Sequence, residues 1–166
     1  MPADADLGDD AVPPSPDRRV LNFIGLDGRA HTGYRELQRR STAWPTTGST
    51  PAGPAGLLAT CRDCFTQAYY AYALFAVAGT WSIFAVEAGL RAKLGADRRA
   101  PFRNLVKQAT AQGLLSEPAW QDGRLDTGRE LRNRAVHGDQ QAVWTPPLSE
   151  RVIGASHEAV AALFPD

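Results

Sequence analysis

The chain has 166 residues, 43% of them apolar and 22% charged, with a mean hydropathy of −0.30. These values are ordinary for one folded soluble domain that is long enough to bury a substantial core. Eighteen basic side chains balance eighteen acidic ones, so the net charge of zero excludes an overall electrostatic signal for nucleic acid.

The first 56 residues are expected to contribute little to the core. Residues 1–17 contain five aspartates, four prolines and no basic residue, which predicts a disordered acidic tail. Residues 18–56 form an N-terminal extension, in which the sequence VLNFIGLDGRAH places Asp27-Gly28 between apolar flanks and predicts a small β-hairpin. A short helix is expected at Tyr34–Arg40, and the Pro/Gly-rich segment after it is expected to be an irregular connection.

Residues 57–166 show helical periodicity, and their apolar spacing predicts five helices. These are expected over Leu57–Tyr70, Tyr72–Leu94, Pro101–Gly113 and Leu125–His137, and from Ser149 onward. Gly95 and Gly138 stand where a glycine commonly ends a helix, and the sequence WTPP at 144–147 is interpreted as a break before the last helix. The predicted fold class is all-α, an antiparallel up-and-down bundle of four to five helices with a small N-terminal β-hairpin extension.

Residues 64–86 are free of charged side chains and long enough to cross a bilayer. They also contain three tyrosines and many alanines, and no flanking run of bases gives them an orientation. A central helix buried by its neighbours explains the same pattern and is preferred to a small membrane-associated protein. Because no signal peptide opens the chain, the cytoplasm is the expected compartment.

The two cysteines, Cys61 and Cys64, match half of a zinc site or a redox pair. No second pair completes four zinc ligands, and the helical setting differs from the βαβ unit of thioredoxin-like proteins. Two packed side chains on a helix are the preferred interpretation, and neither a metal nor a cofactor is expected.

His157, on the apolar stripe of the last helix, is expected to pack at the core edge or in an oligomer contact. Phosphate-binding loops and the serine-hydrolase motif are absent from the sequence.

The segment RELRNRAVHG at 129–138 concentrates groups that suit phosphate chemistry. On a helix, Asn133 and His137 are four residues apart and face the same way, and the long side chain of Arg132 can reach a ligand that they share. An imidazole transfers protons near neutral pH, and a guanidinium offers paired donors to phosphate oxygens. Residues 98–138 hold eight bases and four acids, a net charge of +4 that can attract a phosphate backbone. The alternative is a solvated helix end whose bases favour the C-terminal helix dipole.

The hexapeptide Arg132-Asn133-Arg134-Ala135-Val136-His137 resembles the R-x4–6-H signature of the HEPN superfamily (higher eukaryotes and prokaryotes nucleotide-binding domains). A polar residue directly follows the arginine, as in that signature. The order of elements is also similar to many bacterial HEPN proteins: an apolar helix ending FAVEAGLRAKLG, then FRNLVKQATAQGLL, then RELRNRAVHG. The resemblance covers roughly residues 57–164.

The resemblance implies a helical bundle that forms a homodimer, with the two motif helices facing each other. It implies a metal-independent endoribonuclease, acting as a toxin or in phage defence, with Arg132 and His137 as the catalytic pair and Asn133 as the polar residue that supports them. Glu87 and Arg134 are carried over as supporting residues, and a buried Glu87 requires a partner such as Arg132. Besides its RNA substrate, an antitoxin or a nucleotidyltransferase is an expected partner. The alternative function is a non-catalytic HEPN module that binds nucleotide, RNA or a protein.

Overall fold

The computed structural model describes residues 14–22, 33–115, 130, 133–134 and 144–166. Within them, all regular secondary structure is helical. A short 3-10 helix, η1 (Val20–Asn22), precedes five α-helices: α1 (Tyr34–Thr42), α2 (Ala52–Gln67), α3 (Leu74–Leu94), α4 (Phe102–Ala111) and α7 (Pro146–Leu163). The predicted all-α fold class is confirmed for this part of the chain.

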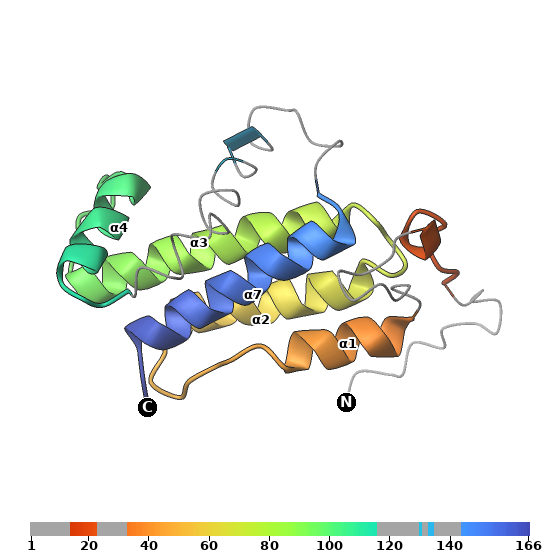
Figure 1. Ribbon diagram of the computed structural model, residues 1–166, viewed down its shortest axis with the longest axis horizontal. Coiled ribbons are helices and arrows are strands. Elements are labelled where there is room, and N and C mark those ends of the chain that lie inside the picture. Colours follow the sequence, from red (N-terminus) through yellow and green to blue (C-terminus); the bar gives the residue numbers. More distant parts are fainter. Residues whose placement is uncertain (1–13, 23–32, 116–129, 131–132, 135–143) are drawn as a thin grey trace, which may run out of the picture.

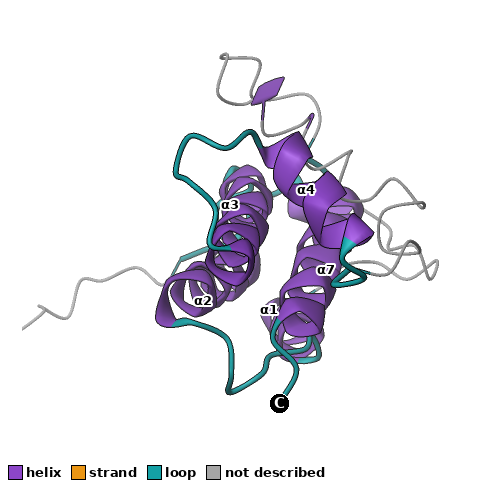
Figure 2. Ribbon diagram, turned by 90° about the vertical axis from the view of Figure 1, so that its left-hand side faces the viewer, coloured by secondary structure: helices purple, strands orange, loops and turns teal. Residues whose placement is uncertain are grey.

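Helix α3 forms the centre of the fold (Figure 1). It packs along α2 and along α7, α1 covers α2, and α4 lies against α3 near its C-terminal end. Helices α1, α2 and α3 alternate in direction, whereas α7 runs in the same direction as α3 (Figure 1). In the view of Figure 2, α4 lies outside the group formed by the other four helices.

Buried side chains lie on both sides of α3. One cluster joins α3 with α4 and α7, through residues such as Leu105 and Val160. A second cluster joins α1, α2 and α3 through Leu37, Phe65 and Phe75, all of which are fully buried. Each large apolar side chain removed from water contributes about 1.5–3 kcal/mol to folding, so these two clusters hold α3 in the interior.

Small residues on one face of α3 allow close contact with α7 and with Trp144, which precedes α7 in the chain. A Cβ atom built on Gly79 would lie within 2.6 Å of three ring carbons of Trp144, which is itself buried. One turn further along, the hydroxyl of Ser156 on α7 donates to the hydroxyl of Ser82 over 3.1 Å. Both serines are fully buried, and each hydroxyl also lies 2.8 Å from a backbone carbonyl oxygen of its own helix, so neither polar group is left unbonded.

Helix α3 is also long and apolar enough, by length and composition, to be a candidate membrane span. Half of its most apolar window is buried inside the fold, against α2 on one side and α7 on another. This environment is compatible with the core helix of a soluble protein.

The helix ends follow local sequence signals. Gly95 after α3 has a φ of 59°, and Gly113 after α4 has a φ of 68°, so both adopt the left-handed conformation that favours glycine. Thr145 caps α7, because its side chain accepts the backbone N–H of Leu148 over 3.4 Å. Trp144 and Thr145 lie outside a helix, as the predicted break requires, but Pro146 and Pro147 do not belong to the break. Helix α7 starts at Pro146, earlier than the predicted Ser149, because proline fits the first turn of a helix, where no N–H partner is needed.

The N-terminal extension differs from the prediction of a β-hairpin. Residues Val20–Asn22, expected in its first strand, form η1 instead, and the described residues contain no strand. Residues 23–32, which include Asp27-Gly28, lie outside the described part. Val20 is fully buried in the second core cluster, so the apolar character of this segment reflects docking onto the helices.

Asp17, the last residue assigned to the acidic tail, contacts the turn between α2 and α3. Its carboxylate accepts the backbone N–H of Tyr72 over 3.0 Å, and its own N–H donates to the carbonyl of Tyr69 over 2.9 Å. Arg19 also pairs with this carboxylate over 2.8 Å. The hydrogen bonds that the carboxylate accepts, of which that from the Arg19 side chain has the largest effect, hold the pKa of Asp17 well below its usual range.

Candidate functional site

The predicted catalytic pair, Arg132 and His137, lies outside the described residues. Of the remaining motif residues that the sequence analysis selected, Asn133 is half-buried and Arg134 is exposed, and both are helical. Glu130, one turn earlier, is helical as well. Three residues of the helix expected over Leu125–His137 are described, and all three are helical, as predicted. Their short ribbon lies on the opposite side of the fold from α1 (Figure 1).

Glu87, the predicted supporting acid, lies on α3 and is largely buried. Its side chain is 15% exposed, and Oε1 accepts a hydrogen bond from Arg91 over 2.6 Å, one helical turn further along. Arg91 also donates to the backbone carbonyl of Ala100 over 3.3 Å, which ties α3 to the chain before α4. Arg91 is therefore one partner that compensates the buried carboxylate, a role that the sequence analysis gave to Arg132.

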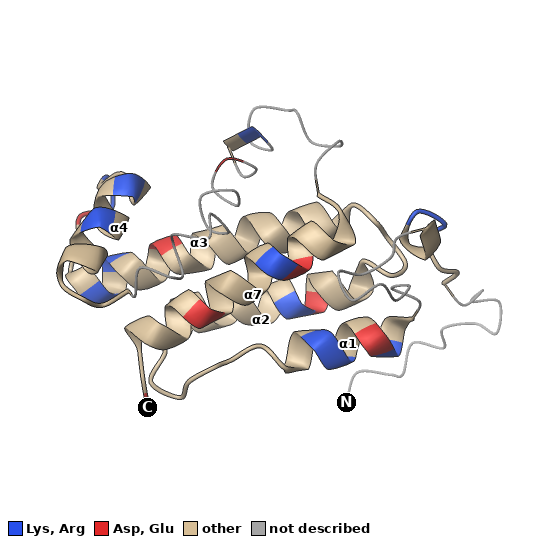
Figure 3. Ribbon diagram, in the orientation of Figure 1, with Lys and Arg blue, Asp and Glu red and all other residues tan. Residues whose placement is uncertain are grey.

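The described part of the basic region is exposed on and before α4. Arg103 and Lys107 are four residues apart on α4 and lie on its exposed side, and Arg98 and Arg99 lie in the preceding turn. The buried side chains of α4, Phe102, Leu105 and Ala109, face α3. In Figure 3 the basic residues mark the side of α4 that faces away from the other helices. Four cations that are free to contact solvent can attract a polyanion.

The two cysteines are unpaired. Cys61 is fully buried in the second core cluster and Cys64 is partly buried. Burial raises the pKa of both thiols, so neither is an activated nucleophile. The interpretation of Cys61 and Cys64 as packed side chains agrees with this environment. Among the described residues, no group of three or more His, Cys, Asp or Glu side chains could hold a metal ion.

A second polar site, which the sequence analysis did not identify, lies between α2, α7 and the loop that joins α1 to α2. It is a pocket of about 70 Å³ that is lined by Arg62 and His157 among otherwise uncharged residues. The remaining lining residues are Pro45, Thr46, Thr47, Thr50, Ala55, Leu58, Ala59, Val160 and Ala161.

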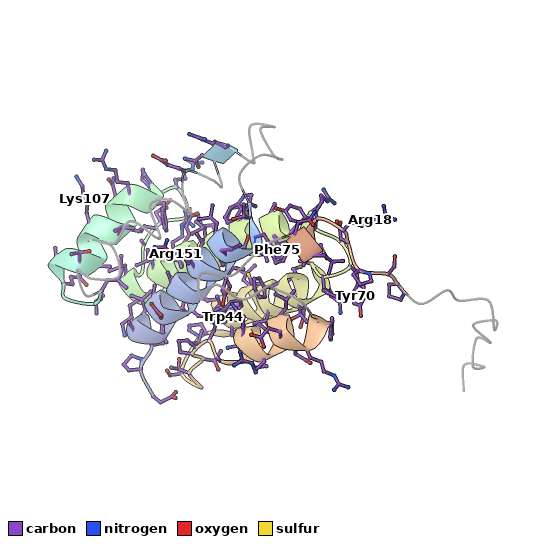
Figure 4. All side chains as sticks on the ribbon, turned by 45° about the vertical axis from the view of Figure 1, so that its right-hand side comes forward. Arg18, Trp44, Tyr70, Phe75, Lys107 and Arg151 are labelled. Carbon is purple, nitrogen blue, oxygen red and sulfur yellow. The ribbon has the colours of Figure 1, made fainter. Side chains whose placement is uncertain are left out.

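Trp44 fixes both polar side chains of this pocket. Its backbone carbonyl accepts a hydrogen bond from Arg62, and its ring lies 5.3 Å from that of His157. In Figure 4, Trp44 lies between α7 and the helices α1 and α2. Next in the chain, the carbonyl of Pro45 lies 3.0 Å from Nδ1 of His157. Since a carbonyl only accepts, Nδ1 carries the proton and Nε2 of the neutral ring is an acceptor.

The pocket holds one cation, Arg62, and two buried polar atoms without partners. Nε of Arg62 and Nε2 of His157 are buried, and neither has a hydrogen-bond partner among the described residues. Burial, and to a lesser extent the nearby charge of Arg62, lowers the pKa of His157 to about 4. Burial also lowers the pKa of Arg62. His157 is packed, as the sequence analysis expected, and it is neutral at physiological pH.

No protein-family model, curated protein or solved structure matches this chain.

Proposed function

We propose that this protein is a metal-independent endoribonuclease of the HEPN type, and that two copies form its active site. The observation that carries the proposal is the hexapeptide Arg132-Asn133-Arg134-Ala135-Val136-His137, which follows a long apolar helix and a short basic one in the chain. The long helix α3 at the centre of the fold and the exposed bases of α4 support it. The finer architecture proposed with it is an up-and-down bundle in which the motif helix packs near α3.

The proposed chemistry needs three tasks at one phosphodiester: activation of the ribose 2′-OH, stabilisation of the charged phosphorane, and protonation of the leaving 5′-oxygen. His137 transfers the protons and Arg132 binds the phosphorane oxygens. Asn133, which is half-buried, orients the imidazole or the ribose. The two-fold axis of a homodimer supplies a second imidazole, so one can act as base and the other as acid.

Glu87 and Arg134 have supporting roles in this proposal. Glu87 is held on α3 by its pair with Arg91, and its carboxylate can fix the orientation of a guanidinium of the motif. Arg134 is exposed and, with the bases of α4, attracts the RNA backbone. Because such attraction is electrostatic, it is strong at low salt and independent of sequence.

The proposed setting is the cytoplasm, where the enzyme acts as a toxin or a phage-defence effector. An antitoxin or a nucleotidyltransferase would then be the partner that restrains it. The informative observation is bacterial growth on expression: the natural chain should arrest growth, and the double variant Arg132→Ala/His137→Ala should not.

The direct test is cleavage of single-stranded RNA by the purified protein in EDTA. We expect products with 2′,3′-cyclic phosphate ends, and a rate that falls by about 10²–10⁴-fold in His137→Ala. His31→Ala is the matched control, because it removes a histidine outside the motif. Undiminished cleavage by His137→Ala contradicts the proposal. RNA binding that is lost in Arg132→Ala, without cleavage by the natural chain, supports the non-catalytic module instead.

A further inference from the structure

The pocket between α2, α7 and the loop after α1 combines a partly buried cation with unused hydrogen-bonding groups. Arg62 has no acidic partner among the residues that line it, and its Nε–H is buried and without an acceptor in the described part of the chain. A buried N–H donor is costly unless a hydrogen-bond acceptor compensates it. The chain supplies one acceptor, the carbonyl of Trp44, which satisfies only part of the group.

His157 adds a requirement of a different kind. Its Nδ1–H donates to Pro45, so the buried Nε2 requires a donor. The ligand must therefore offer an acceptor to Arg62 and a donor to His157. An oxyanion that carries a proton, such as a phosphate group with one P–OH, meets both conditions, whereas sulfate at neutral pH meets only the first.

The loop supplies further polar groups and limits the size of the ligand. The hydroxyls of Thr47 and Thr50 lie 2.7 Å apart, and Thr46 also lines the pocket. Threonine hydroxyls both donate and accept, so they can bind the remaining phosphate oxygens. A volume of about 70 Å³ has room for several water molecules or one tetrahedral oxyanion.

We propose that this pocket binds one phosphate group, with Arg62 as the charged donor, His157 as the acceptor of the P–OH proton, and Thr46, Thr47 and Thr50 around the other oxygens. The site involves none of the motif residues Arg132, Asn133 or His137, so it is independent of the proposed nuclease activity. Two sources share this chemistry: free inorganic phosphate, and the terminal phosphate of a nucleotide in its singly protonated form.

The test is calorimetric titration of the full chain with inorganic phosphate, a 5′-mononucleotide and sulfate at about pH 6, where roughly half of the mononucleotide still carries one P–OH. At this pH we expect phosphate to bind with a Kd on the order of 1 mM or below, and sulfate to bind at least about tenfold more weakly because it cannot donate to His157. Binding by phosphate alone identifies the free ion, and equal binding by the mononucleotide identifies the terminal phosphate. No binding of either overturns the proposal.

Three variants connect the titration to the pocket. Arg62→Lys keeps the charge and a donor for Trp44, but loses the planar fork. His157→Asn keeps a donor for Pro45 and loses the Nε2 acceptor. Both should weaken phosphate binding at least about tenfold, whereas Arg151→Gln, which removes a charge from the exposed side of α7, should not. Equal affinity in all three variants means that phosphate binds elsewhere and overturns the assignment.

An NMR measurement of the natural chain reports the hydrogen bonding of the His157 ring directly, and it does not depend on whether a variant folds. On saturation with phosphate, the ¹⁵N resonance of His157 Nε2 should move as an acceptor that gains a hydrogen bond. A ring that stays unchanged while phosphate binds contradicts the role of His157. Arg62 and His157 are the titratable side chains that line the pocket, and His31, which lies outside both the pocket and the motif, provides an internal reference.

Discussion

Gly79 on α3 lies directly against the ring of Trp144, and a Cβ atom at position 79 would come within 2.6 Å of three carbons of that ring. Trp144 is only 4% exposed and belongs to the larger core cluster, so its ring has little space to move. We expect Gly79→Ala to lower the free energy of unfolding by about 1–3 kcal/mol, because it overpacks the core. Urea denaturation followed by tryptophan fluorescence measures this change.

Gly56→Ala is the matched control for that substitution. Gly56 also lies inside a helix, α2, but a Cβ there meets nothing within 4 Å. Alanine at this position should raise the free energy of unfolding by about 0.4–1 kcal/mol, because it restricts the unfolded chain. If the two variants changed stability in the same direction, the contact between Gly79 and Trp144 would not limit the packing.

The buried imidazole of His157 makes stability depend on pH. Its pKa is about 4 in the folded protein and 6.5 in the unfolded chain, so the unfolded chain binds more protons between these values. The stabilisation that comes from keeping the ring neutral is fully present above pH 6.5 and is lost as the pH falls to about 4. It amounts to about 3 kcal/mol. Urea unfolding of the natural chain and of His157→Asn across this range measures the difference, which should shrink as the pH falls; a constant difference contradicts the prediction.

The helices were predictable where local signals and periodicity agree. Gly95 ends α3 as expected, and Phe102, Leu105 and Ala109 form the buried stripe of α4. Starts that contain proline were misplaced: α2 begins at Ala52, inside a segment interpreted as irregular, and includes Pro54 in its first turn. Proline is tolerated in the first turn of a helix and disrupts it only further along. The presence of proline alone therefore does not show whether a helix begins there or is interrupted.

The pocket of Arg62 and His157 could not be predicted from the sequence, because 94 positions separate the two residues along the chain. Only the packing of α2 on α7 and the path of the loop at Trp44 bring them together. The apolar stripe of α7 correctly indicated a packed His157, but a helical pattern carries no information about which loop meets the ring. The motif, by contrast, consists of six consecutive residues and can be recognised in the sequence without knowledge of the packing.

The exposed bases of α4 should contribute to RNA binding without affecting the fold. Arg103→Gln/Lys107→Gln removes two cations from the exposed side of that helix. If both contact phosphates, the slope of log Kobs against log salt for single-stranded RNA should become shallower by about 1.4. Fluorescence anisotropy at several salt concentrations measures the slope. The control is Arg151→Gln/Arg35→Gln, which removes two cations from the exposed sides of α7 and α1 and should leave the slope unchanged. An unchanged slope in the α4 variant would exclude this helix from the RNA-binding surface.

The ion pair of Glu87 and Arg91 allows the supporting role of Glu87 to be separated from its structural one. Its side chains are only 15% and 26% exposed, so either Glu87→Gln or Arg91→Gln should lower the free energy of unfolding by about 1–3 kcal/mol. If Glu87 also positions a guanidinium of the motif, Glu87→Gln should reduce RNA cleavage by about 10- to 100-fold. Arg91→Gln leaves the carboxylate in place and should reduce cleavage much less. Cleavage rates of both single variants and of the double variant, together with their unfolding free energies, decide between the two roles. Equal losses of activity in the single variants, with no further loss in the double variant, would make Glu87 a purely structural partner of Arg91.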